Sequence, residues 1–374
     1  MSVGANRMLE RFVRLCETVS PTGSEREVAD AVKAELQGLG LEVVEDGAAT
    51  AARAGSGNLI ARVPGTGEGW VMFCAHLDTV PHAAPIEVDL VDGVYRSRGQ
   101  TILGADNKAA VAVLAELAAR CAARPRARGV ELVLTVAEED GLRGAHELDL
   151  GALRAPFGFV LDHASPIGEV ITAAPTYQRL IATFEGLEAH AGIRPEAGHS
   201  AIEAAAAAVS AMNLGRIDEE TTANAGVIAG GTASNVVAGS CRLECEARSL
   251  DDAKAAVALA GLVDACAWAA TQHGCDLDIE VHEVFRAYRL ASSSPVVRLA
   301  SSALERCGHR PREVATGGGS DANALVARGY ECVLLANGTE ANHTPQESVA
   351  VSRLTEMLAV CEAIVELAGD DVPR

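Results

Sequence analysis

The sequence has few lysines, a deficit of positive charge and no long apolar run, and the last two of these each argue against a class of protein. Lysine occurs only at Lys33, Lys108 and Lys254, and the 374 residues carry a formal net charge of −20. Such a charge argues against nucleic acid and anionic membranes as partners. No apolar run is long enough to span a bilayer, and the first residues lack the apolar core of a secretory signal. We therefore expect a soluble cytoplasmic protein.

The cysteines also lack the spacing of a metal or redox motif. None of the ten forms a Cys-x-x-Cys pair, and some, such as Cys74 and Cys332, lie inside apolar segments. Cys241 and Cys245 share one face of an expected strand, but two thiols alone are a poor zinc site. We interpret the cysteines as small buried residues in a reducing compartment.

The order of the expected elements indicates two domains, one inserted into the other. Residues 1–166 and 290–374 show strands that alternate with helices, which is typical of an α/β fold with a doubly wound, mostly parallel sheet. Residues 167–289, beginning with a strand at 167–173, have the order of a small α+β sandwich. Near the N-terminus, Ser24 and Glu27 have the spacing of a capping box for a helix at 25–38.

A stretch from Val71 to Pro81 carries the first chemical signal. The apolar run Val71–Ala75 predicts a buried strand, and Pro81 ends its ladder. His76 and Asp78 follow, on the same side of an extended chain. This pattern suits a metal-bound imidazole with a carboxylate behind it. Taken alone, however, a His-x-Asp pair is more often a core histidine followed by a turn aspartate.

Other acidic and histidine residues occur where strands end or helices begin. Ligands of an open α/β sheet bind beyond the carboxyl ends of its strands, so these side chains are expected to meet at one edge. Each has an ordinary alternative: a helix cap, a solvated acidic turn, a turn aspartate or a surface histidine. The residues are Asp106, Glu138, Glu139, Asp162 and His343.

This set of side chains matches the needs of hydrolysis at two metal ions. Two neutral imidazoles and three carboxylates are the ligand count of a two-zinc site in which one carboxylate bridges. The chemistry needs one more carboxylate, which binds no metal and takes a proton from the attacking water. The consecutive Glu138 and Glu139 supply both roles, because adjacent side chains diverge at the end of a strand.

The motifs, in their order along the chain, resemble those of the co-catalytic di-zinc exopeptidase and deacylase family. That family includes peptidase T, glutamate carboxypeptidases, aminoacylases and succinyl-diaminopimelate desuccinylase. The likeness covers nearly the whole chain. The matching stretches are His76-Leu-Asp78-Thr-Val-Pro, Gly104-Ala-Asp106-Asn-Lys, Glu138-Glu139 and the terminal His343.

The resemblance implies a role for each of these residues. His76, Asp106 and Asp162 would hold one Zn²⁺ ion. Asp106, Glu139 and His343 would hold the other, so that Asp106 is the bridge. Glu138 would be the general base, and Asp78 would fix the tautomer of His76. Co²⁺ or Mn²⁺ are expected substitutes for Zn²⁺.

Four further stretches resemble those of peptidase T-like proteins. They are Thr172-Ala-Ala-Pro175, Glu188-Ala-His190-Ala-Gly192, Gly231-Thr-Ala-Ser-Asn235 and Gly317-Gly-Gly-Ser-Asp321-Ala-Asn323. The resemblance implies that His190 reaches across a dimer interface to stabilise the oxyanion. It also implies substrate contacts from Asn235, Arg248, Gly318 and Ser320. Without the family, His190 is more simply an interface histidine and Arg248 a partner of Asp251 or Asp252, while His163 has no assigned role.

Together these patterns predict a zinc metallopeptidase that removes the N-terminal residue of short peptides, as a tripeptide aminopeptidase does. Residues 1–166 and 290–374 would form the catalytic domain, and 167–289 the lid and dimerisation domain of a homodimer. An N-acyl amino acid deacylase or a carboxypeptidase on the same site is the nearest alternative. The alternative outside the enzymes is a protein that binds peptides without cleaving them.

Overall fold

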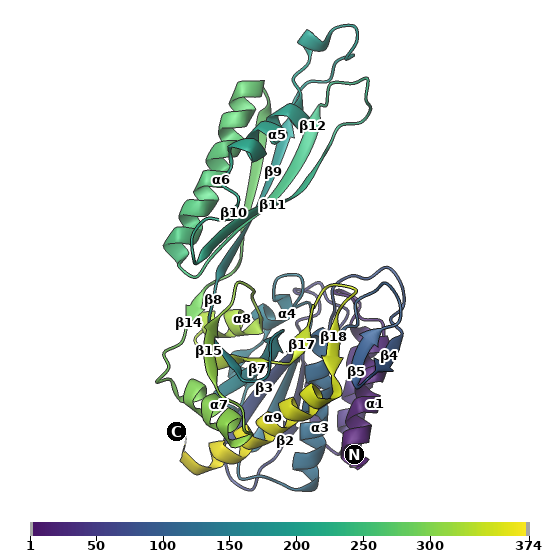
Figure 1. Cartoon of the computed structure of the whole chain (residues 1–374), viewed down its shortest axis with the longest axis vertical. Helices are drawn as coiled ribbons and strands as arrows, with labels where there is room; N and C mark the ends of the chain where they lie inside the picture. The colour runs from purple at the N-terminus through teal and green to yellow at the C-terminus, as the bar shows by residue number, and fades with distance from the viewer. Residues whose placement is uncertain (1–2, 372–374) are drawn as a thin grey trace. The chain divides into compact units, whose positions relative to one another are not determined.

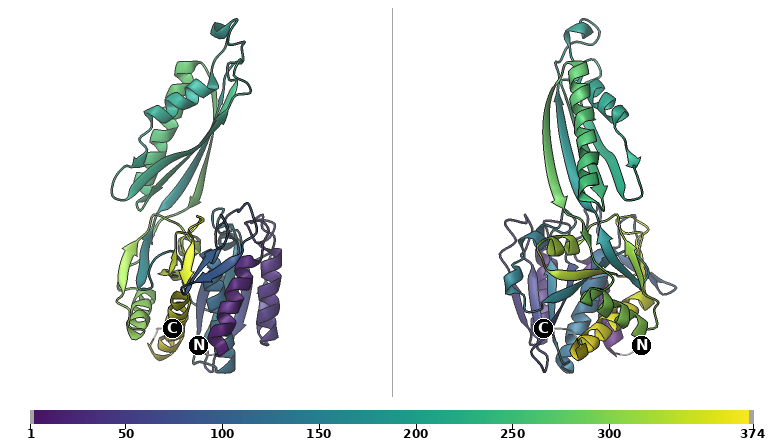
Figure 2. Two further views of the ribbon diagram at one scale, coloured as in Figure 1. Left: turned by 45° about the vertical axis from the view of Figure 1, so that its right-hand side comes forward. Right: turned by 90° about the vertical axis from the view of Figure 1, so that its left-hand side faces the viewer.

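The computed structural model describes residues 3–371, which separate into two compact units (Figures 1 and 2). The larger unit contains the described chain up to Thr172, then Arg289–Ala315, and the chain from Ser320 onward. The smaller unit contains Ala173–Tyr288 and the short segment Thr316–Gly319. Residues 1 and 2, part of the N-terminus in which we expect no secretory signal, lie outside the described residues.

A nine-stranded sheet with a parallel centre forms the larger unit. Four neighbouring central strands run parallel: β6 (Gly129–Thr135), β3 (Trp70–His76), β7 (Phe157–His163) and β16 (Glu331–Ala336). Antiparallel strands flank them: β2 (Leu59–Val63) and β1 (Glu42–Glu45) beyond β6, and β8 (Glu169–Ala174) beyond β16. The short strands β14 (Tyr288–Arg289) and β15 (Arg312–Ala315) complete the sheet. The predicted α/β class with a mostly parallel central sheet is confirmed.

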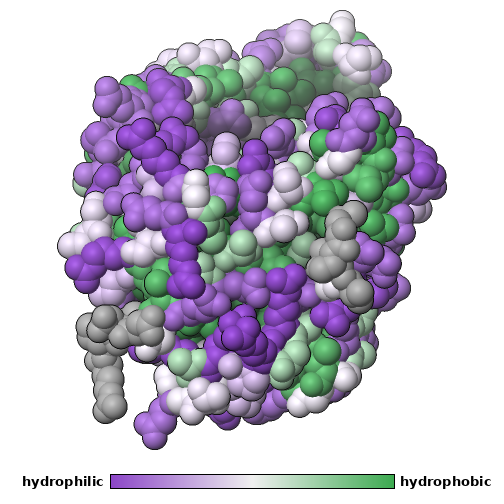
Figure 3. Space-filling model, turned by 60° about the horizontal axis from the view of Figure 1, so that its bottom comes forward, coloured by the Kyte–Doolittle hydropathy of each residue, from purple (hydrophilic) through white to green (hydrophobic). Residues whose placement is uncertain are grey.

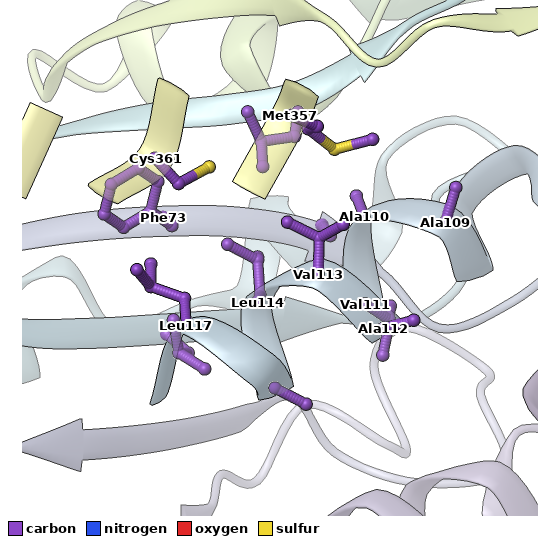
Figure 4. Packing of buried hydrophobic residues seen from close by; sticks show 14 of the residues in the cluster. Phe73, Ala109, Ala110, Val111, Ala112, Val113, Leu114, Leu117, Met357 and Cys361 are labelled. Carbon is purple, nitrogen blue, oxygen red and sulfur yellow. The ribbon is translucent and has the colours of Figure 1, made fainter. Parts of the chain in front are cut away.

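Helices cover both faces of this sheet, as the alternation of side chains along β3 shows. Phe73 packs with α3 (Ala105–Ala123) and α9 (Val351–Asp371) in the main core (Figure 4). The next residue, Cys74, projects from the opposite face. Its thiol lies 3.6 Å from the carboxylate of Asp321, the first residue of α8 (Asp321–Ala327). Because helices cover both faces, β2, β3 and β6 are almost entirely buried, and most of their residues are apolar.

The remaining helices of the larger unit are α1 (Val3–Glu17), α2 (Arg26–Gly38), the short α4 (Arg143–Glu147) and α7 (Pro295–Arg306). The capping box predicted at the start of α2 is wrong. The N-cap residue is Glu25, and no side chain caps the helix there. The buried carboxylate of Glu25 instead accepts hydrogen bonds from the backbone N–H groups of Gly23 and Gly55. It thereby joins two loops.

A separate four-stranded sheet, mostly unpredicted, carries one of the candidate ligands. Its strands, in spatial order, are β17 (Thr339–Glu340), β18 (Ser348–Ala350), β5 (Val94–Ser97) and β4 (Val88–Val91). Only β5 matches a strand that the sequence predicts, a short one at residues 93–98, because the other strands are short or lack a clear alternation of apolar and polar side chains. His343 lies in the loop between β17 and β18.

The end of the larger unit near the start of α1 and the end of α9 has a mixed surface, in which hydrophilic side chains surround smaller apolar areas (Figure 3). Charged side chains also join the helices of this unit. The almost fully buried guanidinium of Arg11 lies 2.5 Å from Glu35 of α2 and 3.6 Å from Glu116 of α3. These ion pairs tie α1 to both neighbouring helices.

The smaller unit is an antiparallel sheet covered by two helices. The strand order is β10 (Gly215–Arg216), β11 (Thr221–Gly230), β12 (Ser240–Ser249), β9 (Thr176–Glu185) and β13 (Asp276–Phe285). Helices α5 (Ala201–Ala211) and α6 (Asp252–His273) pack on it. The strand predicted at 167–173 was wrongly assigned to this unit. It corresponds to β8, most of which belongs to the larger unit because it pairs with β16.

Helix α6 is the one helix among residues 3–371 that is long and apolar enough to cross a membrane by length and composition. Its buried residues, among them Leu262 and Cys266, belong to the core of the smaller unit. A helix that packs on a sheet in this way passes the same test of composition as a membrane span.

Candidate metal centre

His76 lies at the end of β3, and two carboxylates surround its Nε2 atom. The side chain is buried, and its Nε2 lies 3.1 Å from Asp106 Oδ1 and 3.4 Å from Asp162 Oδ1. Asp162 comes from β7, the direct neighbour of β3, and Asp106 comes from the first turn of α3. The sheet and the helix start therefore bring together three side chains that the sequence separates widely.

His343 makes a second group with the other oxygen of Asp106. Its Nε2 lies 3.1 Å from Asp106 Oδ2 and 3.0 Å from Glu139 Oε1. Glu139 follows β6, and half of the His343 side chain is exposed. In each group the ligand atoms lie within 4.8 Å of one another. The five predicted ligands thus form two groups that share Asp106.

The backbone before α3 explains why Asp106 is available to both groups. Gly104, not Asp106, is the N-cap, and its φ of 73° lies in the left-handed region that glycine adopts without strain. Asp106 itself has non-helical angles, with ψ at 103°. Its carboxylate faces His76 on one side and His343 on the other. The ordinary role of a helix cap is therefore not the role of this carboxylate.

Asp78 is fully buried behind both His76 and the two glutamates. Its carboxylate oxygens accept hydrogen bonds from the backbone N–H of Glu138 at 3.1 Å and of Glu139 at 3.2 Å. The Thr22 hydroxyl donates a third bond at 2.7 Å. Burial by itself raises the pKa of Asp78, but its interactions with His76 and these donors outweigh burial and lower it.

The other ring nitrogen of His76, Nδ1, faces Asp78. His76 Nδ1 lies 3.1 Å from the backbone oxygen of Asp78 and 3.5 Å from the carboxylate. A proton on Nδ1 therefore has an acceptor, and Nε2 is left with its lone pair toward the carboxylates. The backbone carbonyl of Asp78 is closer to His76 Nδ1 than the Asp78 carboxylate is, whereas the sequence had indicated only the carboxylate.

Two asparagines next to the ligands were missed. Asn107 donates a hydrogen bond from Nδ2 to Asp162 Oδ1 at 3.0 Å, and Asn342 donates one to Asp106 Oδ2 at 2.9 Å. The amide oxygens of both are buried and have no hydrogen-bond partner among the described residues. Each asparagine is adjacent in sequence to a predicted ligand, and that adjacency was the available signal.

Glu138 lies at the site without belonging to either group that shares Asp106. Its side chain is buried, and a carboxylate oxygen lies within 4.8 Å of ligand atoms of His76 and Glu139. Its backbone is held by Asp78, as is that of Glu139. The two side chains of the predicted Glu-Glu pair therefore reach the same centre from one turn, whose backbone is bonded to Asp78.

The electrostatics of the centre show an excess of negative charge. Burial, together with the charge of neighbouring carboxylates, raises the pKa of Glu138 and Glu139 and raises the pKa of Asp162 to about 8. Hydrogen bonds from His343 to Asp106 and Glu139 raise the pKa of that histidine to about 10. Buried carboxylates with raised pKa values lack compensating cations, and divalent metal ions would provide them.

The donor set fits two such ions. A tetrahedral zinc ion with bonds of about 2.0–2.1 Å separates its ligand atoms by roughly 3.3 Å. The four imidazole–carboxylate separations of 3.1, 3.4, 3.1 and 3.0 Å are close to that value. Imidazole nitrogens and carboxylate oxygens are also the donors that zinc and its neighbouring transition metals accept.

Comparison with known proteins agrees with this geometry. Residues 72–367 match Peptidase family M20/M25/M40. The chain belongs to this family of metal-dependent peptidases. It is 37% identical over 370 residues to the uncharacterised protein YqjE of Bacillus subtilis, covering 98% of this chain and 100% of that protein.

Two solved structures are similar over nearly the whole of this M20 peptidase. Aminopeptidase PepT from Bacillus cereus is 37% identical with a TM-score of 0.83, covering 97% of this chain and 98% of its own. A tripeptidase from Staphylococcus aureus is 33% identical with a TM-score of 0.90, covering 98% of this chain and 99% of its own. The predicted resemblance to peptidase T-like proteins is confirmed.

Three predicted residues of the M20 peptidase lie in its smaller unit. His190 is exposed, and its Nδ1 accepts a hydrogen bond from the backbone N–H of Gly192 at 3.2 Å. The backbone oxygen of Asn235 accepts one from Ala191 at 2.9 Å, which places the His190 and Asn235 loops side by side. The third residue, Arg248, lies on β12. Their substrate roles stay predictions.

The guanidinium of Arg248 already has an acidic partner, Glu246, which sequence reasoning missed. Two nitrogens of Arg248 donate to Glu246 at 3.2 and 3.1 Å. The guanidinium also lies 4.2 Å from the centre of the Tyr177 ring and donates to the backbone oxygen of Gly317 at 3.2 Å. The alternative partner Asp251 instead caps α6. A substrate carboxylate would have to share Arg248 with Glu246.

The remaining predicted residues have local roles in this structure. Ser320 is fully buried, and its hydroxyl caps α8. The exposed Gly318 donates its N–H to the hydroxyl of Thr316 at 3.1 Å. His163, which had no assigned role, has its Nδ1 2.8 Å from the hydroxyl of Ser165, and burial lowers its pKa. Substrate contacts by Gly318 and Ser320 stay predictions.

Proposed function

We propose that this M20 peptidase uses two divalent metal ions, Zn²⁺ or its substitutes Co²⁺ and Mn²⁺, to remove the N-terminal residue of short peptides. The observation that carries the proposal is the shared carboxylate of Asp106. One of its oxygens faces His76 and the other faces His343. The similarity to an aminopeptidase and a tripeptidase, each above 30% identity, supports the substrate class.

The residues that would hold the ions follow from the two groups. His76, Asp106 and Asp162 would hold one, and Asp106, Glu139 and His343 the other. When bound, two such ions polarise the scissile carbonyl and lower the pKa of the attacking water. The protein contributes neutral imidazoles, which requires that His76 carry its proton on Nδ1 toward Asp78.

Glu138 then performs the proton transfers. Its carboxylate accepts the proton of the attacking water and delivers it to the nitrogen of the leaving amine. Asp78 holds the backbone of Glu138, so the base keeps its place beside the ligands through both transfers. Burial of the Glu138 side chain limits competition from bulk water.

The acidic groups of the centre favour a substrate with a free α-amino group. The carboxylates of Asp106, Glu138, Glu139 and Asp162 all lie around the proposed ions. Two divalent ions balance the charge of these carboxylates, but a free amine can still donate hydrogen bonds to their oxygens, which an acyl group in its place cannot do. We therefore place the N-terminus of the peptide at the metal centre. Contacts from His190, Asn235 and Arg248, a homodimer through residues 167–289 and a cytoplasmic location remain part of the proposal.

A matched pair of substrates tests this polarity. The zinc-loaded protein is incubated with a free tripeptide and with its N-acetylated form, and the products are identified by mass. We expect release of the N-terminal residue from the free peptide and no cleavage of the acetylated one. Faster hydrolysis of the acetylated member favours the deacylase alternative. Release of the C-terminal residue first favours the carboxypeptidase, and cleavage of neither favours a silent binding protein.

A further inference from the structure

Glu347 is a buried carboxylate that no step of the proposed reaction uses. It is 1% exposed and accepts three backbone hydrogen bonds from the segment that spans the start of α3. Its Oε2 accepts from Leu103 at 2.8 Å and from Gly104 at 2.9 Å, and its Oε1 accepts from Asp106 at 2.8 Å. One side chain therefore holds the backbone of the shared ligand from a distance of 241 residues in sequence.

The same residue belongs to the loop that carries His343. The N–H of Glu347 donates to the backbone oxygen of Thr344 at 3.1 Å, which closes a turn just after the histidine. β18 begins at the next residue and pairs with β5. Glu347 is thus anchored on one side by a strand and connected on the other to a metal ligand.

The backbone N–H groups at the start of α3 need a hydrogen-bond acceptor. The first N–H groups of a helix have no partner within it. Here the left-handed Gly104 and the non-helical Asp106 also interrupt the regular start of α3. A shift of this backbone would move both oxygens of the Asp106 carboxylate, and with them both groups of ligands.

We propose that Glu347 is a positioning residue that sets the separation between the Asp106 carboxylate and His343 and thereby couples the two metal sites. This inference rests on the proposed two-ion function. It assigns Glu347 no contact with metal or substrate. Its effect is transmitted through the backbone of Leu103, Gly104 and Asp106.

The alternative is that Glu347 is an ordinary buried carboxylate with a purely structural role. Glu131 on β6 provides the matched control. It is fully buried, and its Oε2 accepts backbone hydrogen bonds from Arg154 at 2.9 Å and Ala155 at 3.1 Å. Its Oε1 pairs with Arg62 at 2.9 Å. Glu131 is therefore also a buried carboxylate that accepts backbone hydrogen bonds, although it pairs with Arg62 as well. The segment that it holds precedes β7, at the opposite end of that strand from Asp162.

The experiment compares Glu347→Gln with Glu131→Gln in the full-length protein. In either glutamine, one end of the carboxamide donates instead of accepting, so backbone hydrogen bonds are lost. Amide hydrogen exchange is measured on the metal-free proteins, and Zn²⁺ binding is measured by calorimetry. We expect Glu347→Gln to speed exchange in a peptide covering residues 101–107 by about tenfold or more. We expect it to weaken Zn²⁺ binding by about 10- to 100-fold.

Glu131→Gln should speed exchange near residues 153–156 and leave Zn²⁺ binding within about twofold of the wild type. Unchanged Zn²⁺ affinity in Glu347→Gln overturns the inference, as does an equal loss in both variants. If Glu347→Gln fails to fold, Glu347→Asp replaces it, because it keeps the charge but shortens the reach, and the same two readouts decide. A wild-type protein that binds no second ion overturns the proposed function instead, and unchanged exchange at 101–107 overturns the positioning role independently of metal.

Discussion

The carboxylate of Asp78 accepts a hydrogen bond from the backbone N–H of Glu138 at 3.1 Å, across 60 residues of sequence. Its second oxygen accepts from Glu139. The sequence had suggested that Asp78 acts only on His76. The structure shows that the same side chain also holds the turn that presents the proposed base and one proposed ligand.

Replacing Asp78 should therefore affect both the histidine and the glutamates. Asp78→Asn keeps the shape, but one end of its amide cannot accept the backbone hydrogen bonds. We expect turnover to fall by about 10- to 100-fold, with weaker metal retention. The measurements are kcat on a free tripeptide and metal content after gel filtration.

Thr22→Val is the milder variant, because it keeps Asp78 and removes the 2.7 Å hydrogen bond to its carboxylate together with a long 3.4 Å bond to the backbone oxygen of Thr79. We expect a loss of less than about tenfold. Thr18→Val removes a hydroxyl that bonds only to the Arg14 backbone on the exposed side of α1, and it should change nothing. Wild-type turnover in Asp78→Asn would show that the aspartate has no role in holding the site.

Loss of the proposed base should separate catalysis from metal binding. Glu138→Gln keeps the size of the side chain but cannot take a proton, so kcat should fall by roughly two to four decades. Metal content, measured by elemental analysis, should stay at the wild-type level. Asp140→Asn is the control, since Asp140 is exposed and pairs with Arg143. Near-normal kcat in Glu138→Gln would identify another residue as the base.

The metal content itself is a third prediction. The wild-type protein should hold two divalent ions per chain and lose activity in a chelator, because two groups of ligands share Asp106. His343→Ala should lose one of the two ions. His82→Ala should lose neither, as His82 belongs to neither group of ligands and is bonded to the backbone of Ala84. Full activity with at most one tightly bound ion would contradict the shared-carboxylate site.

The pH dependence of stability can be predicted from Glu35. Burial alone raises its pKa, but hydrogen bonds from Arg11 and Arg14 outweigh burial and lower the pKa below its usual 4.5. The pKa of Glu35 is lower in the folded protein than in the unfolded chain. The contribution of Glu35 to the free energy of unfolding is therefore complete at pH values above its pKa in the unfolded chain, and it is lost as the pH falls through its pKa in the folded protein. We expect Glu35→Gln to lower the free energy of unfolding by about 1–2 kcal/mol at neutral pH.

That difference between the wild type and Glu35→Gln should shrink as the pH falls below the usual carboxyl range and should vanish in acid. Urea unfolding at a series of pH values measures it. Arg26 provides the comparison, since it also pairs with a carboxylate but is largely exposed. Arg26→Gln should change stability by less than about 1 kcal/mol at every pH. A Glu35→Gln difference that stays constant down to low pH would contradict the assigned pKa direction.

Local patterns in the sequence were sufficient for the central strands and for naming the candidate ligands that the structure brings together. Apolar runs such as Val71–Ala75 predict buried strands because both faces of a parallel sheet are covered. His76, Asp162 and Glu139 stand at or just beyond the ends of such strands, and the ends of parallel strands meet at one edge. Hydrolysis at two metal ions also followed from the residue types, whereas the choice between a peptidase and a deacylase came from the resemblance of the motifs to a known family.

Only the tertiary structure decided which loops meet, and therefore which polar groups become partners. The bond of Thr22 to Asp78, that of Asn342 to Asp106 and those of Glu347 to the segment that spans the start of α3 all join residues far apart in sequence. Ser24 was mistaken for the N-cap of α2, a position that Glu25 occupies, and the partner of the Glu25 carboxylate, Gly55, lies in a distant loop. A buried carboxylate must find donors wherever folding places them. Sequence can show that a group needs a partner, but the packed chain determines which partner it finds.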